Sequence, residues 1–248
     1  MLPEKRVVMM LDKGIGLKEE SDLIETSKEY VTFAKIGWGI SRVLPEELLK
    51  KKIETYKEAD IIAYPGGTCL ESALLQERLE EFTEWCKEVG FGALEVSNGS
   101  IEITEEEKCE LISRLSKDFI VLSEVGKKDP TEDRELSISE RADYVRRELK
   151  AGSYKVITEA RESGKDIGFY DGKGEVKQDE IDEFLKLVRW EDVIFEAPEK
   201  KQQVYFIKNI DPDVNLGNIA SREVIALETL RRGLRGDTLM HIFNLLKR

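Results

Sequence analysis

The feature that most constrains the fold of this chain is a short apolar run that recurs eight times. Almost every run has polar or charged residues toward its end, and each is followed by a longer segment of helical character. Each gap can hold a crossover helix, which needs at least about 10 to 12 residues including its turns. The runs span residues 6–14, 30–39, 59–67, 92–100, 119–128, 154–164, 191–200 and 213–220.

Helical patterns between these runs support the same architecture. Residues 75–90 space apolar side chains at three- and four-residue intervals and stop at Gly90, while residues 104–118 and 137–152 begin at Thr104 and Ser137. Eight β/α units with no linker predict an α/β fold, a single (β/α)8 TIM barrel with a parallel eight-stranded core, as one domain over residues 1–248. A doubly wound sheet is disfavoured because no glycine-rich phosphate turn follows the first strand.

Charge and hydropathy exclude several functional classes. The formal net charge of -12 argues against a nucleic-acid partner, because phosphate backbones require a basic surface. No stretch approaches the roughly 20 apolar residues of a membrane span, and no signal peptide precedes the first strand, so we expect a cytoplasmic chain without a membrane partner. Its three cysteines lack metal-ligand spacing, and we expect reduced thiols.

Polar residues at the strand ends indicate where function lies. Active sites of barrels sit at the carboxyl ends of the strands, where the βα loops open, so these side chains should meet at one mouth. Many strand-end polar groups only cap the next helix, and Glu196 before Ala197 and Pro198 could satisfy loop amides in this way. The set comprises Asp12, Lys13, Lys35, Tyr64, Glu95, Glu124, Lys127, Lys128, Glu159, Arg161, Glu196, Asn215 and Asn218.

Three carboxylates from consecutive strands, Glu95, Glu124 and Glu159, are the candidate ligands of a hard divalent cation, for which Mg2+ is the expected cofactor. A salt-bridge network of these carboxylates with Lys13, Lys35 and Arg161 is the competing interpretation. An acidic chain that gathers cations beside carboxylates fits a metal held together with a small polyanion, because isolated buried charges are too costly to retain.

Two segments are candidate anion seats. The sequence "NLGNIASREV", with Asn215 and Asn218, is predicted to place Gly217 in a turn after the last strand and to lead through Ser221 into a helix N-terminus. A helix N-terminus favours an anion, and this is the usual phosphate position of the fold. The sequence "ARESG" offers Arg161, Ser163 and Gly164 as a second grip. His241, the single histidine, lies near the end of the chain, so proton transfer is expected from lysines or carboxylates.

Nine motifs in order, from Asp12 to Thr238, resemble the phosphosulfolactate synthase family, which includes bacterial and plant heat-stress-associated relatives. They are "LDKG", "FAKIGWG", "YPGGT", "EVSNGS", "SEVGKK", "ITEARESG", "IFEAP", "VNLGNI" and "ETLRRGLRGDT". The resemblance implies a carbon-sulfur lyase that adds sulfite to phosphoenolpyruvate with Mg2+ and gives (2R)-phospho-3-sulfolactate, the first step of coenzyme M biosynthesis.

The same resemblance implies residue roles. The lysine pair of "EVGKK" would supply the general acid, Lys128 in preference to Lys127, with Lys35 and Arg161 as further catalytic groups. Lys13, Ser163, Gly164, Asn215, Gly217 and Asn218 would bind substrate. Two alternatives remain: another Mg2+-dependent barrel lyase or aldolase acting on a phosphorylated enol or keto acid, and a non-enzymatic stress-related interaction protein. A homo-oligomer with Trp38 at a subunit contact is a further possibility.

Overall fold

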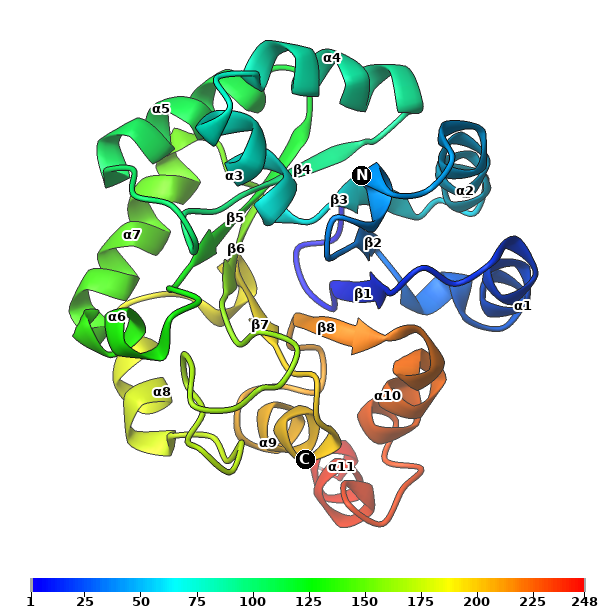
Figure 1. Cartoon of the computed structure of the whole chain (residues 1–248). Coiled ribbons are helices and arrows are strands. Elements are labelled where there is room, and N and C mark those ends of the chain that lie inside the picture. Colours follow the sequence, from blue (N-terminus) through cyan, green and yellow to red (C-terminus); the bar gives the residue numbers. More distant parts are fainter. Residues whose placement is uncertain (1, 248) are drawn as a thin grey trace.

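The computed structural model describes residues 2–247 and has a barrel of eight parallel strands surrounded by helices (Figure 1). All eight strands predicted from the apolar runs are present. They are β1 (Val8–Asp12), β2 (Phe33–Ile36), β3 (Ile62–Pro65), β4 (Ala93–Val96), β5 (Ile120–Val125), β6 (Lys155–Thr158), β7 (Val193–Glu196) and β8 (Leu216–Ala220). The predicted (β/α)8 TIM barrel is therefore confirmed.

The sheet runs in the order β3-β2-β1-β8-β7-β6-β5-β4, so β3 and β4 are its two ends. Near these ends the amide of Gly92 donates to the carbonyl of Ala63 at 3.2 Å, but β3 and β4 form no regular ladder within residues 2–247. We call this junction the seam. Two helices, α3 (Gly67–Leu75) and α4 (Leu79–Val89), lie between β3 and β4 in the chain. The barrel is therefore nearly closed.

The other helices form the outer layer of the barrel, as Figure 1 shows. They are α1 (Leu17–Ser27), α2 (Glu46–Glu58), α5 (Glu105–Leu115), α6 (Pro130–Glu135), α7 (Ile138–Ala151), α8 (Gln178–Phe184), α9 (Lys200–Asn209), α10 (Val224–Arg231) and α11 (Leu239–Leu246). Two short 3-10 turns, Ile40–Arg42 and Ser221–Glu223, precede α2 and α10. Within residues 2–247, no helix has the length and apolarity that crossing a membrane requires.

The predicted helix signals correspond to real caps. Thr104 and Ser137 each form a capping box, in which the hydroxyl accepts from the third helical amide and a glutamate returns to the cap amide. Gly90 ends α4 with φ of 95° and Gly152 ends α7 with φ of 120°, left-handed values that glycine adopts at little cost. Residues 76–78 of the predicted 75–90 helix instead form a turn between α3 and α4.

The core has an inner part inside the barrel and an outer part between strands and helices. Met9, Phe33, Tyr64, Leu122 and Ile157 are among the fully buried side chains of the inner part. They fill the barrel below the strand ends, as expected for this fold. The polar strand ends therefore stand on a packed apolar plug, and the charged side chains can only face the open mouth.

Candidate active site

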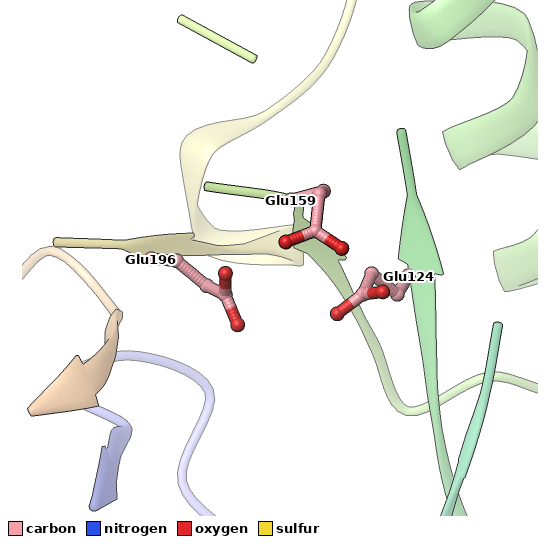
Figure 2. A group of neighbouring side chains, drawn as sticks. All are labelled: Glu124, Glu159 and Glu196. Atoms are coloured by element: carbon pink, nitrogen blue, oxygen red, sulfur yellow. The ribbon is translucent and has the colours of Figure 1, made fainter. Parts of the chain in front are cut away.

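Four glutamates from neighbouring strands converge at the carboxyl end of the barrel. Glu95, Glu124 and Glu196 lie in β4, β5 and β7, and Glu159 directly follows β6. Their exposed fractions are between 1% and 3%. Figure 2 shows Glu124, Glu159 and Glu196 pointing toward one another. The parallel sheet produces this arrangement because it brings the carboxyl ends of its strands to the same edge.

Two lysines are inserted among these carboxylates. The Nζ of Lys35 lies 2.8 Å from Glu95 Oε2, 3.5 Å from Glu196 Oε1 and 3.8 Å from Glu124 Oε2. The Nζ of Lys128 lies 3.2 Å from Glu124 Oε1 and 3.0 Å from Glu159 Oε2. Glu124 is therefore shared by both ammonium groups. We call these six side chains the charged ring.

Burial and neighbouring charges shift the pKa values of the ring in opposite directions. Burial opposes ionisation of Glu124, but attraction to Lys128 and Lys35 outweighs it and lowers the Glu124 pKa to about 2. Burial raises the pKa of Glu196 to about 7 against the attraction of Lys35. Burial and repulsion from Glu124 raise the pKa of Glu159 well above its usual range. Acidic groups of such unequal strength are typical of catalytic sites.

Both ring lysines remain protonated. Burial opposes the charged form of Lys35, but attraction to Glu95, Glu196 and Glu124 raises the Lys35 pKa. The same balance, with Glu124 and Glu159 as the attracting groups, raises the pKa of Lys128. Each lysine can therefore neutralise a developing negative charge, while the attraction of the neighbouring carboxylates opposes release of its proton.

The carboxylates whose oxygens come together as possible metal ligands are Glu124, Glu159 and Glu196, with one oxygen of each within 4.8 Å of the others. The sequence-based set contained Glu95 instead of Glu196. Glu95 is engaged elsewhere: its Oε1 accepts from the amide of Gly67 at 2.8 Å, and its Oε2 pairs with Lys35. The Oε2 of Glu196 accepts from the amide of Ala160 at 2.9 Å, as expected if Glu196 satisfies loop amides. Its Oε1 does not bond a loop amide within residues 2–247 and lies beside Lys35.

Buried polar contacts outside the ring hold its members in place. Lys108 of α5 donates to the backbone carbonyl of Glu124 and to the carboxylate of Glu148, both at 2.6 Å. Asp133 of α6 accepts from the amides of Lys127 and Gly168 and pairs with Arg141 at 2.8 Å. These contacts restrict the backbone on both sides of Glu124.

Lys127 and Lys128 point to different places, although they are adjacent in the chain. The Nζ of Lys127 donates to the carbonyl of Asn98 at 2.8 Å and lines a small hollow beside α5, away from the ring. The structure therefore brings Lys128, and not Lys127, to the carboxylates. Sequence alone could not separate them, because the loop conformation after Gly126 decides which side chain faces the mouth.

Arg161 and Lys13 lie at the rim of the mouth. Arg161 lines the central cavity, and its backbone has a left-handed φ of 55°. Lys13 lies over the indole of Trp38, 4.6 Å from the ring centroid, and 3.8 Å from Glu162. Of the predicted salt-bridge network, Lys35 pairs with ring carboxylates, Lys13 pairs with Glu162, and the guanidinium of Arg161 has no carboxylate partner within residues 2–247.

Ser163 and Gly164, from the predicted second anion grip, are not brought to the ring. Ser163 is exposed, whereas Gly164 is buried. The carbonyl of Gly164 accepts from Gln202 at 2.8 Å, and a side chain on Gly164 would meet Gln202 and Pro198. Gly164 therefore packs the loop against α9 instead of opening to a ligand.

The structure differs from the predicted anion site after the last strand at two of its three residues, Asn215 and Gly217. Asn215 precedes β8, where its side chain accepts from the amide of Val7 and donates to the carbonyl of Val193, so it lies at the opposite end of the barrel. Gly217 lies within β8 and not in a turn, and an added Cβ would sit 2.4 Å from Met9 Cε. Its role is to leave space inside the barrel.

Asn218 does reach the cavity. Its side-chain amide donates to the carbonyl of Arg161 at 3.1 Å, while its buried Oδ1 has no hydrogen-bond partner among residues 2–247. A buried acceptor without a partner is rare because it loses its hydration. Asn218 therefore offers one unused acceptor to a ligand at the mouth.

The cavity above the ring is large and extends to one side. It has a volume of about 950 Å³ and reaches from Glu124, Glu159 and Glu196 over the seam to α3 and α4. The part of the cavity next to α3 and α4 is lined by Arg42, Ser72, Arg78, Phe82 and Trp85. We call this part the seam compartment. Sequence reasoning did not find it, because its residues come from separate elements and none belongs to a polar strand end.

The fold and the site define a (β/α)8 barrel with a charged cavity at the carboxyl ends of its strands, the usual position of barrel active sites. Comparison with known proteins gives the family. The (2R)-phospho-3-sulfolactate synthase (ComA) family model matches residues 3–237. The chain belongs to this family, as the sequence motifs indicated, and this membership supports an enzymatic role.

Individual relatives agree with this assignment. The phosphosulfolactate synthase of Methanothermobacter thermautotrophicus is 49% identical, with 94% of this chain and 91% of the relative covered. That of Methanocaldococcus jannaschii is 46% identical over 95% of this chain and 94% of the relative. Protein HEAT-STRESS-ASSOCIATED 32 of Arabidopsis thaliana is a more distant relative, 23% identical over 85% of this chain and 79% of that protein.

Proposed function

We propose that this protein is a Mg2+-dependent phosphosulfolactate synthase, which adds sulfite to phosphoenolpyruvate and forms (2R)-phospho-3-sulfolactate. As a carbon-sulfur lyase it would catalyse the first step of coenzyme M biosynthesis. The observation that carries the proposal is the charged ring at the barrel mouth of a chain that belongs to this family. Its substrates would be small anions, which suits a site that combines lysines with candidate metal ligands.

The donor set fits a hard divalent cation. Glu124, Glu159 and Glu196 offer three converging carboxylate oxygens, the ligand type that Mg2+ prefers. Burial raises the pKa values of Glu159 and Glu196, and a divalent cation bound between their oxygens would favour the ionised forms of both carboxylates. The bound ion would act as a Lewis acid that lowers the energy of negative charge building on the carboxylate of phosphoenolpyruvate.

The residues of the ring can perform the remaining steps. Sulfite forms the carbon-sulfur bond at the methylene carbon through its sulfur lone pair, and the electron pair of the double bond moves toward the substrate carboxylate. The ammonium group of Lys35 would stabilise this charge. Lys128 would then donate a proton to the carbon that bears the phosphate, and solvent would return a proton to its amine.

Arg161 would hold the substrate phosphate. Its guanidinium is free of carboxylates within the described residues and lines the cavity beside Glu159, as a phosphate grip requires. Asn218, which is bonded to the carbonyl of Arg161, would fix this loop and present its free acceptor to bound water.

The test is the sulfite-dependent loss of phosphoenolpyruvate by the purified protein, with Mg2+ and with EDTA, followed by 31P NMR and mass spectrometry. We expect a phosphorylated sulfonate product only when sulfite and Mg2+ are both present. If folded protein with Mg2+ gives no product, the proposed reaction is wrong. Another phosphorylated enol or keto acid, or a non-enzymatic interaction role, would then be tested next.

A further inference from the structure

The seam compartment contains one of two arginines whose guanidinium forms no ion pair or hydrogen bond within residues 2–247. All the other arginines of this range pair with a carboxylate or bond a backbone carbonyl, as Arg78 does with Glu81 and Arg231 with Val214. The two exceptions are Arg42 and Arg161, and the charge of Arg42 acts on a carboxylate only at longer range, that of Glu46. Arg42 and Arg161 both line the cavity. They come from opposite parts of its wall, Arg42 from the segment after β2 and Arg161 from the loop after β6.

Arg42 is held in a defined orientation. Its guanidinium carbon lies 4.2 Å from the centroid of the Trp85 ring, a cation–π arrangement. Trp85 in turn packs against Phe82 and Phe91, with ring centroids 6.0 Å and 5.9 Å away. Ser41, next to Arg42, contacts Cys69 of α3 at 3.7 Å. The planar fork of Arg42 is therefore supported on one face by aromatic rings.

This geometry suits a small oxyanion. A guanidinium presents parallel N–H donors that match two oxygens of a sulfite, sulfate or phosphate group. Ser72 of α3, which also lines the compartment, adds a hydroxyl donor.

We propose that the seam compartment binds the sulfite nucleophile, with Arg42 stacked on Trp85 as its specific anchor. The inference rests on the proposed function, in which two multiply charged anions must occupy one cavity. Their mutual repulsion favours separate cations, because two like charges held close together are unfavourable. Arg161 and Lys128 would contact phosphoenolpyruvate on one side of the cavity, and Arg42 would bind sulfite on the other side.

The first test is a comparison of the two KM values in Arg42→Gln, Arg42→Lys and wild-type protein. We expect Arg42→Gln to raise KM for sulfite at least tenfold and to change KM for phosphoenolpyruvate less than twofold, with an unchanged unfolding midpoint. The KM for sulfite of Arg42→Lys should lie between the values of wild-type protein and Arg42→Gln. Arg146→Gln is the control, because Arg146 pairs with Asp143 on the exposed face of α7. Equal effects of Arg42→Gln on both KM values, or no effect, would overturn the proposal.

The second test measures binding without turnover. Sulfate serves as the unreactive probe, and the fluorescence of Trp38→Phe protein, which retains Trp85 and Trp190, is the signal. We expect saturable quenching by sulfate that is lost in the Trp38→Phe/Arg42→Gln double variant. Quenching by phosphoenolpyruvate alone, or sulfate quenching that persists without Arg42, would contradict the proposal. Arg42-dependent sulfate binding in a protein that forms no product would reject the proposed reaction and retain the oxyanion site.

Discussion

The Nζ of Lys128 lies 3.0 Å from the Oε2 of Glu159, and Glu159 belongs to the carboxylate triplet that could bind a cation. The proton donor proposed for the second step and the candidate metal ligands are therefore direct neighbours. If Glu159 served as a metal ligand, its attraction for the Lys128 proton would be weakened. Proton donation and charge neutralisation would then be coupled through one carboxylate.

Lys128→Ala should lose turnover while keeping the fold. General-acid catalysis contributes about 10²- to 10⁴-fold, so we expect kcat to fall in this range with a small change in KM for phosphoenolpyruvate. Lys128→Arg should bind substrate almost normally, because it keeps the charge, but should remain slow, because arginine does not give up its proton. Steady-state kinetics of both variants, checked by circular dichroism, measure this.

Lys127→Ala is the matched control for Lys128. Its ammonium group contacts the carbonyl of Asn98 and not the ring, so its removal should lower kcat no more than a few-fold and reduce the unfolding midpoint slightly. If Lys127→Ala were as inactive as Lys128→Ala, the assignment of the proton donor to Lys128 would be wrong.

Glu196→Gln should weaken Mg2+ binding more than Glu95→Gln does. Glu196 contributes an oxygen to the converging triplet, whereas Glu95 is occupied by Lys35 and the Gly67 amide. We expect the Mg2+ concentration for half-maximal activity to rise about 10- to 100-fold in Glu196→Gln, in line with the effects of altering a metal site. Isothermal titration with Mg2+ gives an independent reading. A larger loss of affinity in Glu95→Gln would favour the set predicted from sequence.

The fold was predictable from the sequence because buried parallel strands leave a simple pattern. Both faces of such strands are covered, so each appears as a short apolar run that ends in polar residues at the mouth. The last run, 213–220, has Asn215 near its start and Asn218 near its end, and the sequence does not show which of the two lies at the mouth. Asn215 was therefore predicted at the wrong end of the barrel. Gly217 could not be explained either, since its constraints are the side chains of Met9 and Ile194 on the two neighbouring strands.

The members of the charged ring were predictable, and the seam compartment was not. All six follow from their positions at or just after strand ends, because the fold itself brings those ends together: Lys35, Glu95, Glu124, Lys128, Glu159 and Glu196. Arg42 and Trp85 are far apart in the chain and meet only through the packing of the Ile40–Arg42 turn against α4. No local pattern carries that information.

Gly67→Ala, at the start of α3 beside the seam, should lower both kcat and stability. A Cβ at this position would lie 2.3 Å from Ser97 Oγ and 2.8 Å from Glu95 Oε1, so Glu95 would have to move away from Lys35. We expect kcat to fall at least tenfold and stability to fall by about 1 to 3 kcal/mol, as for an overpacked core. Gly236→Ala is the comparison, because nothing lies within 4 Å of its added Cβ. Wild-type kinetics in Gly67→Ala would contradict the expectation.

Glu20→Gln should reduce the pH dependence of stability. In the network below the first βα loop, Lys52 lies 2.9 Å from Asp12 Oδ2 and 3.0 Å from Glu20 Oε2, so one buried ammonium group serves two carboxylates. Burial raises the pKa of Glu20 to about 7 against the attraction of Lys52. The folded state therefore retains a proton on Glu20 between its usual pKa, near 4.5, and pH 7, whereas the unfolded state releases it.

Because the folded state binds the extra proton, the contribution of Glu20 to stability is present below pH 4.5 and is lost as the pH rises to 7. The shift corresponds to about 2 to 3 kcal/mol of unfolding free energy across this window. Urea unfolding at pH 5 and pH 8 should show wild-type protein losing more stability over the interval than Glu20→Gln. Because the ring carboxylates titrate in both proteins, the difference between the two slopes isolates Glu20. Identical slopes would mean that Glu20 is ionised throughout, with Lys52 fully compensating both carboxylates.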